Sequence, residues 1–219
     1  MIVPSMNKLE LAHEIFSDSK TVLKRAIYYY PKMRRIAIKS KNKYYHQIFD
    51  YKSQRKNNWI ILIDYYLKEP TVAITPHFLD ANGFNAIMIN PLLQQLTHIS
   101  SHFLDRYNQR FLKHENISRL EILKKFITHN YASIIHPLSF NEGVSDRFFG
   151  RTNHGTCLGY RENIGSTTMD HYNTFISIDM IYKSQQNYLD MTSNDYSEYW
   201  NEEFSYTGLP AFNSMEIGA

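Results

Sequence analysis

The chain has 219 residues, 43% of them hydrophobic, and a formal net charge of +3, which excludes an intrinsically disordered protein. Its single cysteine, Cys157, excludes an internal disulfide. The charge is uneven: residues 1–56 hold 13 Lys and Arg against 4 Asp and Glu, whereas residues 184–219 hold six carboxylates and no Lys or Arg. This asymmetry indicates either a polyanionic partner for the basic end or two solvated surfaces.

Residues 1–16 lack the apolar run of a secretory signal, and the apolar segment 59–63 is too short to span a bilayer. An unpaired cysteine suits a reducing compartment. The sequence therefore predicts a cytoplasmic protein with no membrane partner.

The first half of the chain predicts one helix followed by strands. Residues 7–30 have apolar residues at helical spacing, with a break expected near Ser17 to Ser19 and an end at Pro31. Segments 34–40, 43–51 and 58–66 are expected to be strands, and 69–78 and 83–90 to be extended.

The second half begins with helical signals. Pro91 is expected to start a helix through residue 99, and Ser100 or Ser101 to cap a helix over 102–113. Ser118 and Glu121 have the spacing of a capping box for a further helix. Strands are expected over 154–162 and 172–178, followed by a last helix over 179–191.

This order of elements predicts the α+β class, with a mainly antiparallel sheet and helices packed on one side. Three regions are expected: a basic region 1–90, an α+β region 91–183 and an acidic aromatic tail 184–219. A single domain is the alternative.

The stretch "SSHFLDRYNQRF" carries the main candidate site. His102, Arg106 and Arg110 recur every four residues, so in a helix they form one row, and neither arginine has a carboxylate three or four positions away. Such a row suits an external phosphate, unless distant carboxylates pair with the arginines. In the first turn of a helix His102 is expected to stay neutral, as a general base requires.

Two further residues are expected to complete this site. His154 lies at a turn that enters a strand, and Thr174 lies on the next strand, where its hydroxyl can hydrogen-bond a phosphate oxygen. The histidines follow no metal-binding pattern, and the sequence contains neither a P-loop nor a dinucleotide-binding glycine motif. No cofactor and no metal are therefore expected.

The stretch "SSHFLDRYNQRF", followed by a capped second helix, resembles a helix of the barnase, EndoU, colicin and RelE group of ribonuclease toxins, over about 90 residues from Pro91 to Ile178. In that group the helix usually ends in an arginine followed by a glycine, and here Phe111 stands in place of the glycine after Arg110. The resemblance implies RNA cleavage without a metal, by attack of the ribose 2′-hydroxyl on the adjacent phosphorus. It implies His102 as the base, His154 as the acid with His171 in reserve, Arg106 and Arg110 as cations, and Thr174 as the phosphate positioner.

The resemblance also implies RNA and a cognate inhibitor protein as partners. Two other functions stay open: a non-catalytic nucleic-acid-binding module, and a structural or interaction protein of a phage or mobile element. If the site is real, His102, Arg106 and Arg110 line a groove that faces His154 and Thr174. The tail 184–219 is expected to pack on the basic surface and mask it. The oligomeric state is not indicated by the sequence.

Overall fold

The structure is a computed structural model that describes residues 1–181, apart from 41–43, 67–68, 91–94, 132–133 and 138–146. It divides into a first unit, Met1–Ser177, and a second unit, Ile178–Ala219. Of the second unit only residues 178–181 are described, and they contain a short 3₁₀ turn, η2 (Ile178–Met180).

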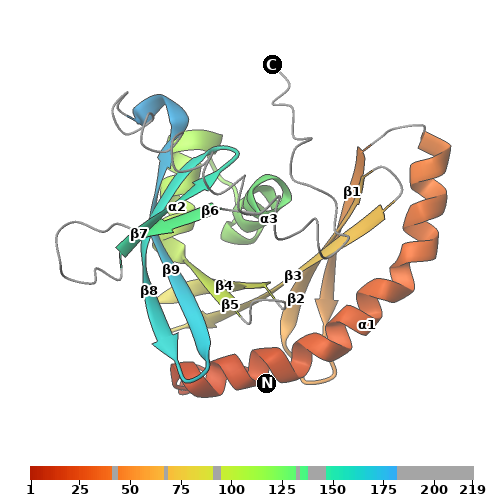
Figure 1. The fold of residues 1–219 in the computed structure, drawn as a ribbon, viewed down its shortest axis with the longest axis horizontal. Coiled ribbons are helices and arrows are strands. Elements are labelled where there is room, and N and C mark those ends of the chain that lie inside the picture. The colour runs from red at the N-terminus through yellow and green to blue at the C-terminus, as the bar shows by residue number, and fades with distance from the viewer. Residues whose placement is uncertain (41–43, 67–68, 91–94, 132–133, 138–146, 182–219) are drawn as a thin grey trace. The chain divides into compact units, whose positions relative to one another are not determined.

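The first unit contains three α-helices and nine strands within its described residues (Figure 1). The helices are α1 (Lys8–Ser40), α2 (Ser101–Tyr107) and α3 (Arg119–Asn130), and a π-helical turn, η1 (Asn108–Leu112), extends α2. The strands are β1 (Tyr44–Lys52), β2 (Asn58–Tyr66), β3 (Glu69–Asp80), β4 (Gly83–Asn90), β5 (Gln95–Ser100), β6 (Ile134–Pro137), β7 (Arg147–Thr152), β8 (Gly155–Ile164) and β9 (Thr167–Ser177).

These strands form one sheet in the order β1-β2-β3-β4-β5-β9-β8-β7-β6. Strands β1 to β5 follow one another as antiparallel neighbours, and β6 to β9 form a second antiparallel run. The two runs meet where β5 pairs with β9 in parallel. The predicted α+β class and mainly antiparallel sheet are therefore confirmed, and one sheet crosses the expected boundary at residue 90.

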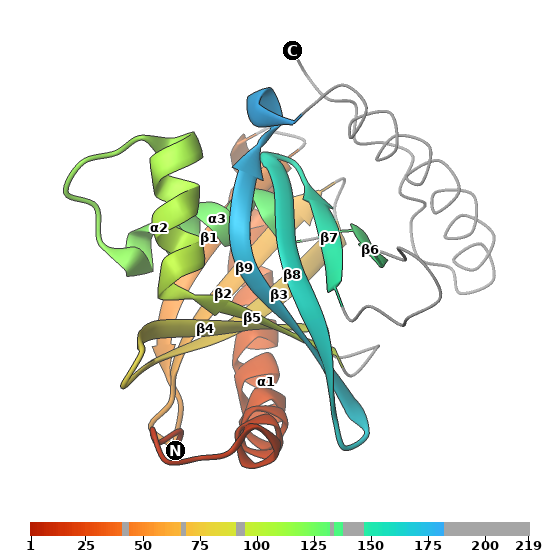
Figure 2. The same ribbon diagram turned by 90° about the vertical axis from the view of Figure 1, so that its left-hand side faces the viewer.

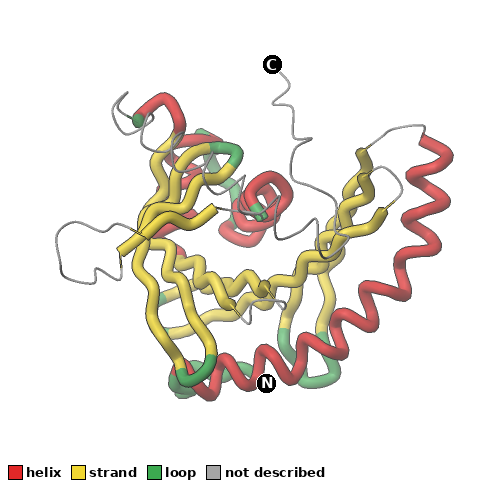
Figure 3. The backbone as a smooth tube through the Cα atoms, viewed as in Figure 1, coloured by secondary structure: helices red, strands yellow, loops and turns green. Residues whose placement is uncertain are grey.

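Helices α2 and α3 pack together against one face of this sheet, where Phe103, Tyr107 and Phe126 join Ile60 in a buried cluster. Helix α1 lies against the opposite face, where Trp59 and Ile61 belong to a second cluster. Neighbouring residues of a strand point to opposite faces, so β2 supplies Ile60 to one core and Ile61 to the other. Figures 2 and 3 show α1 running along the outside of the sheet that holds α2 and α3.

Two predictions about the first helix were wrong. Residues 17–19 do not break α1, because Asp18 and Ser19 are buried against the rest of the unit. Pro31 lies within the helix, and residues 34–40, which were expected to form a strand, continue it. The buried stripe continues past the proline through Met33 and Ala37, so packing on the sheet outweighs the lost backbone hydrogen bond.

The prediction of a helix over residues 91–99 was also wrong for the residues that the structure describes, since residues 95–100 form β5. This strand is central and pairs with both β4 and β9, which satisfies its backbone on both sides. Residues 91–94 lie outside the described residues.

The helix caps were predicted correctly. The side chain of Ser100 accepts a hydrogen bond from Phe103 N, and that of Ser118 accepts one from Glu121 N. The predicted strands 58–66 and 83–90 match β2 and β4. Nearly all of the predicted last helix over 179–191, and the whole tail 184–219, lie outside the described residues.

Candidate functional site

The row predicted on α2 exists, but its members have different surroundings. His102 is exposed and has no hydrogen-bond or ion-pair partner among the described residues. Arg106 donates to Gln109 Oε1 at 2.9 Å. Arg110, in the π-helical turn, donates to the carbonyl oxygen of Phe175 at 2.5 Å and lies 3.4 Å from Thr174 Oγ1. Arg110 therefore ties η1 to β9.

His154 is held on the α2 side of the sheet. Its Nδ1 lies 2.7 Å from the buried Tyr107 hydroxyl and 3.1 Å from Asn130 Nδ2. Its ring stacks on Phe111 with 4.0 Å between the ring centroids. Burial, followed by the nearby His129, lowers the pKa of His154 to about 4, so it is neutral at neutral pH. No carboxylate opposes this shift of the His154 pKa, so His154 does not suit a general acid.

No hydrogen bond or ring contact joins His102 to His154 among the described residues. Tyr107, which contacts His154, lies about 7.5 Å further along the helix axis than His102 and is buried, whereas His102 is exposed. His154 is held against Tyr107 and Phe111, whereas His102 faces solvent.

We expect His154→Ala to lower the free energy of unfolding by about 1–3 kcal/mol, because the buried Tyr107 hydroxyl loses its acceptor. The RNA cleavage that the sequence predicts, measured under conditions where the variant is folded, should stay at the wild-type rate. His102→Ala is the matched control and should change stability by less than about 0.5 kcal/mol. A His154→Ala protein of wild-type stability that no longer cleaves RNA would return the catalytic role to this residue.

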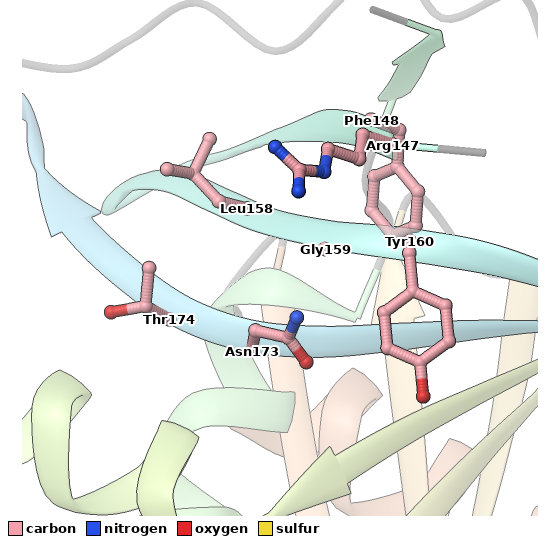
Figure 4. A pocket seen from close by; sticks show the side chains of 7 residues that line it. All are labelled: Arg147, Phe148, Leu158, Gly159, Tyr160, Asn173 and Thr174. Atoms are coloured by element: carbon pink, nitrogen blue, oxygen red, sulfur yellow. The ribbon is translucent and has the colours of Figure 1, made fainter. Parts of the chain in front are cut away.

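A shallow hollow of about 610 Å³ lies over strands β7, β8 and β9 (Figure 4). Its polar lining comes from Arg147, Tyr160, Asn173 and Thr174, so one predicted site residue, Thr174, is part of it. The β8–β9 register shifts between Leu158 and Gly159 at this point. A Cβ on Gly159 would lie 2.0 Å from the carbonyl oxygen of His171, so the close approach of the two strands requires glycine. Irregularities of this kind are common next to active sites.

A histidine and a carboxylate face each other beside the hollow. His171 Nε2, on β9, lies 3.1 Å from Glu162 Oε2, on β8. Lys8, in the first turn of α1, contacts the same carboxylate oxygen at 2.5 Å. The ring of Tyr160, which lines the hollow, stacks on His171 with 4.5 Å between centroids. Proton carriers, a cation and a hollow are thus adjacent.

A second histidine fixes which nitrogen of His171 exchanges its proton. Asn85 Nδ2 donates to the Gly83 carbonyl, so its Oδ1 accepts the proton of His98 Nε2 at 2.8 Å. When His98 is neutral, its Nδ1 is therefore bare, and it accepts from His171 Nδ1 at 3.1 Å. The first proton of His171 then resides on Nδ1, and the nitrogen that gains and loses a second proton is Nε2, beside Glu162.

The pKa shifts agree with this assignment. Burial lowers the pKa of His98 to about 4, which keeps His98 neutral. Burial, followed by the charge of Lys8, lowers the pKa of His171 below its ordinary value, while Glu162 opposes this shift. The hydrogen bond from Lys8 lowers the pKa of Glu162, so its carboxylate is ionised at neutral pH. Exposed fractions are 8% for His171, 35% for Glu162 and 50% for Lys8, so solvent reaches the pair from the Glu162 side.

Sequence reasoning found His171 as a reserve acid but missed Glu162, Lys8 and His98. The signal for His98 is the parallel pairing of β5 with β9, which places it opposite His171 and which no local pattern indicates. Cys157 is buried, and burial raises the pKa of its thiol, so it is not a nucleophile. Within the described part of the chain, no group of three or more His, Cys, Asp or Glu residues could hold a metal ion.

Comparison of the chain with protein-family models, with curated proteins and with solved structures found no match. In the described residues no helix has both the length and the apolar character needed to cross a membrane.

Proposed function

We propose that the chain is an RNA endonuclease that needs no metal and cleaves by attack of the ribose 2′-hydroxyl on the adjacent phosphorus. The observation that carries this proposal is the pair of His171 and Glu162, 3.1 Å apart beside the hollow over β7 to β9. This chemistry requires one group that accepts a proton and one that donates a proton. The pair supplies both, which His102 and His154 in their separate positions do not.

Glu162 accepts the proton of the 2′-hydroxyl, and the 2′-oxygen forms a bond to phosphorus. The bond between phosphorus and the 5′-oxygen breaks, and protonated His171 gives its Nε2 proton to that oxygen. The products are a 2′,3′-cyclic phosphate and a free 5′-hydroxyl, with Glu162 protonated and His171 neutral. Exchange of one proton with water on each residue restores the starting state.

The remaining residues of the site have supporting roles in this proposal. Lys8, which contacts Glu162, stabilises the negative charge that develops on the phosphoryl oxygens. The hollow receives a nucleotide, with Arg147 and Thr174 on the phosphate and Tyr160 beside the ribose or base. His98 and Asn85 do not contact the RNA. They position His171 by holding its Nδ1 proton.

We also propose the cellular setting that such an activity requires. A ribonuclease made inside a cell acts on cytoplasmic RNA, and the producing cell needs an inhibitor protein to survive it. A partner that covers the hollow would block the nuclease directly.

Incubation of the protein with total RNA in the presence of EDTA tests the proposal. Cleavage that yields 2′,3′-cyclic ends supports it. Binding without cleavage would select the alternative, a non-catalytic nucleic-acid-binding module. Absence of both would leave a structural or interaction protein and contradict the proposal.

A further inference from the structure

Helix α1 presents a row of cations to solvent along its second half. From residue 19 to residue 40 the helix contains no carboxylate, and its seven Lys and Arg side chains are all exposed: Lys20, Lys24, Arg25, Lys32, Arg34, Arg35 and Lys39. None of them forms an ion pair with another described residue. These cations therefore lack the local compensation that an ordinary solvated helix face obtains from mixed charges.

The row lies on the side of α1 that faces away from the sheet. The buried stripe of the same segment consists of Val22, Ala26, Met33 and Ala37. At 100° per residue, Lys24 and Arg35 lie about 170° from the centre of this stripe and Lys32 about 110°, so all three point away from the sheet. From Lys20 to Lys39 the segment extends for about 28 Å, and the packing of α1 on the sheet fixes the backbone that carries these cations.

An exposed aromatic ring interrupts the row of cations. Tyr28 is 71% exposed and lies between Lys24 and Lys32 on the same side of the helix. The guanidinium of Arg25 lies 5.1 Å from the ring centroids of both Tyr28 and Tyr29, which holds Arg25 and the Tyr28 ring in a fixed relation. A positively charged track with a ring on it is the combination that binds single-stranded nucleic acid, because phosphates meet the cations and a base stacks on the ring.

We propose that this face of α1, residues 20–39, is a binding surface for single-stranded RNA, separate from the hollow over β7 to β9. The alternative partner of a basic helix is an anionic lipid surface, which requires an apolar face to insert. The main apolar face of α1 is buried against the sheet. The segment also exposes Ile27 and Ile38, but these are 11 positions apart and form no continuous apolar face, which favours RNA. The surface goes beyond the proposed cleavage, since it requires only phosphates and bases and none of the catalytic residues.

The test compares two variants that remove the same charge. Lys24→Gln with Lys32→Gln removes two cations of the row, and Lys52→Gln with Lys125→Gln removes two exposed cations elsewhere. Binding of a fluorescent 2′-O-methyl RNA strand, which cannot be cleaved by 2′-hydroxyl attack, is followed by anisotropy from low to high salt. We expect the α1 variant to lose at least about tenfold in affinity at low salt. Its log–log salt slope should be shallower by about 1.4, at about 0.7 per phosphate contact.

The control variant should keep nearly the wild-type affinity. An equal loss of RNA affinity in both variants would mean that binding depends only on the total charge of the protein. That result would contradict a specific RNA-binding surface on α1, and so would wild-type affinity of the α1 variant. Vesicles of phosphatidylcholine and phosphatidylserine are measured in parallel. Binding to them that depends on α1, without RNA binding, would replace RNA by a lipid surface. Because the RNA is not cleavable, loss of the proposed catalysis does not affect any of these results.

Discussion

Replacing Glu162 by Gln is expected to lower the rate of RNA cleavage by about 10²- to 10⁴-fold, the usual effect of removing a general base. The amide keeps the size of the side chain but cannot accept the 2′-hydroxyl proton. The Lys8 to Glu162 ion pair is half exposed, so its loss should change the free energy of unfolding by less than about 1 kcal/mol. Cleavage is measured as initial rate on a defined RNA, with thermal unfolding as the check on folding.

Two further variants make this result specific. Glu115→Gln removes an equal charge from an exposed loop and should cleave at the wild-type rate. His171→Gln should lose activity to a similar extent as Glu162→Gln, and the double variant should be little worse than either single one, because the two residues act as a unit. Full activity of Glu162→Gln in a folded protein would contradict the assignment of this site.

The rate of cleavage should be greatest below pH 6.5 and fall as the pH rises. In the proposed mechanism the active form has Glu162 ionised and His171 protonated. The pKa of Glu162 is lowered, first by the Lys8 hydrogen bond, and the pKa of His171 is lowered, first by burial. His171 therefore loses its second proton at a pH below the ordinary histidine pKa of 6.5. Above the pKa of His171, kcat/KM should decline about tenfold per pH unit. A profile of kcat/KM against pH measures both limbs.

Lys8→Gln provides the matched comparison. Without the ammonium group the pKa of Glu162 should rise, which moves the acid limb to higher pH, and the pKa of His171 should rise as well.

The stability of the fold needs a separate check at each pH, since His98 has a folded-state pKa of about 4 against an ordinary 6.5. The unfolded state then binds more protons between these values, so stability decreases as the pH falls through that window. A rate maximum at or above pH 7, or identical profiles for the two proteins, would contradict the assigned roles.

Local signals in the sequence predicted the elements whose structure is decided locally. The strands 58–66 and 83–90 have alternating or continuous apolar residues, and the caps at Ser100 and Ser118 depend on a single side chain. The predictions for residues 34–40 and 95–100 were wrong because the structure of these segments is decided by distant contacts. The first segment is helical because Met33 and Ala37 continue a stripe buried on the sheet, and the second is a strand because two neighbours pair with it.

The same difference explains the candidate site. Thr174 was predicted from its place on a strand, and His171 was named only as the reserve that the resemblance implies for His154. Glu162, His98 and Lys8 come from β8, β5 and α1, and Lys8 and Glu162 are 154 positions apart in the chain. The parallel contact of β5 with β9 brings His98 to His171, and the docking of α1 brings Lys8 to Glu162. Glu162 itself reaches His171 across the β8–β9 hairpin, whose register no local pattern indicated. The regular His102, Arg106 and Arg110 row reflects a helix at the border of the core, with Arg110 fixed on Phe175.

The most direct test of the proposed cleavage uses one oligonucleotide made of deoxynucleotides with a single ribonucleotide in its centre, together with an all-deoxy strand of the same sequence. In EDTA, the wild-type protein should cut the first strand after the ribonucleotide, leave a 2′,3′-cyclic phosphate, and leave the all-deoxy strand intact. Glu162→Gln should leave both intact. Cleavage of the all-deoxy strand, a 3′-hydroxyl product, or unchanged cleavage by Glu162→Gln would contradict 2′-hydroxyl attack assisted by Glu162 and His171.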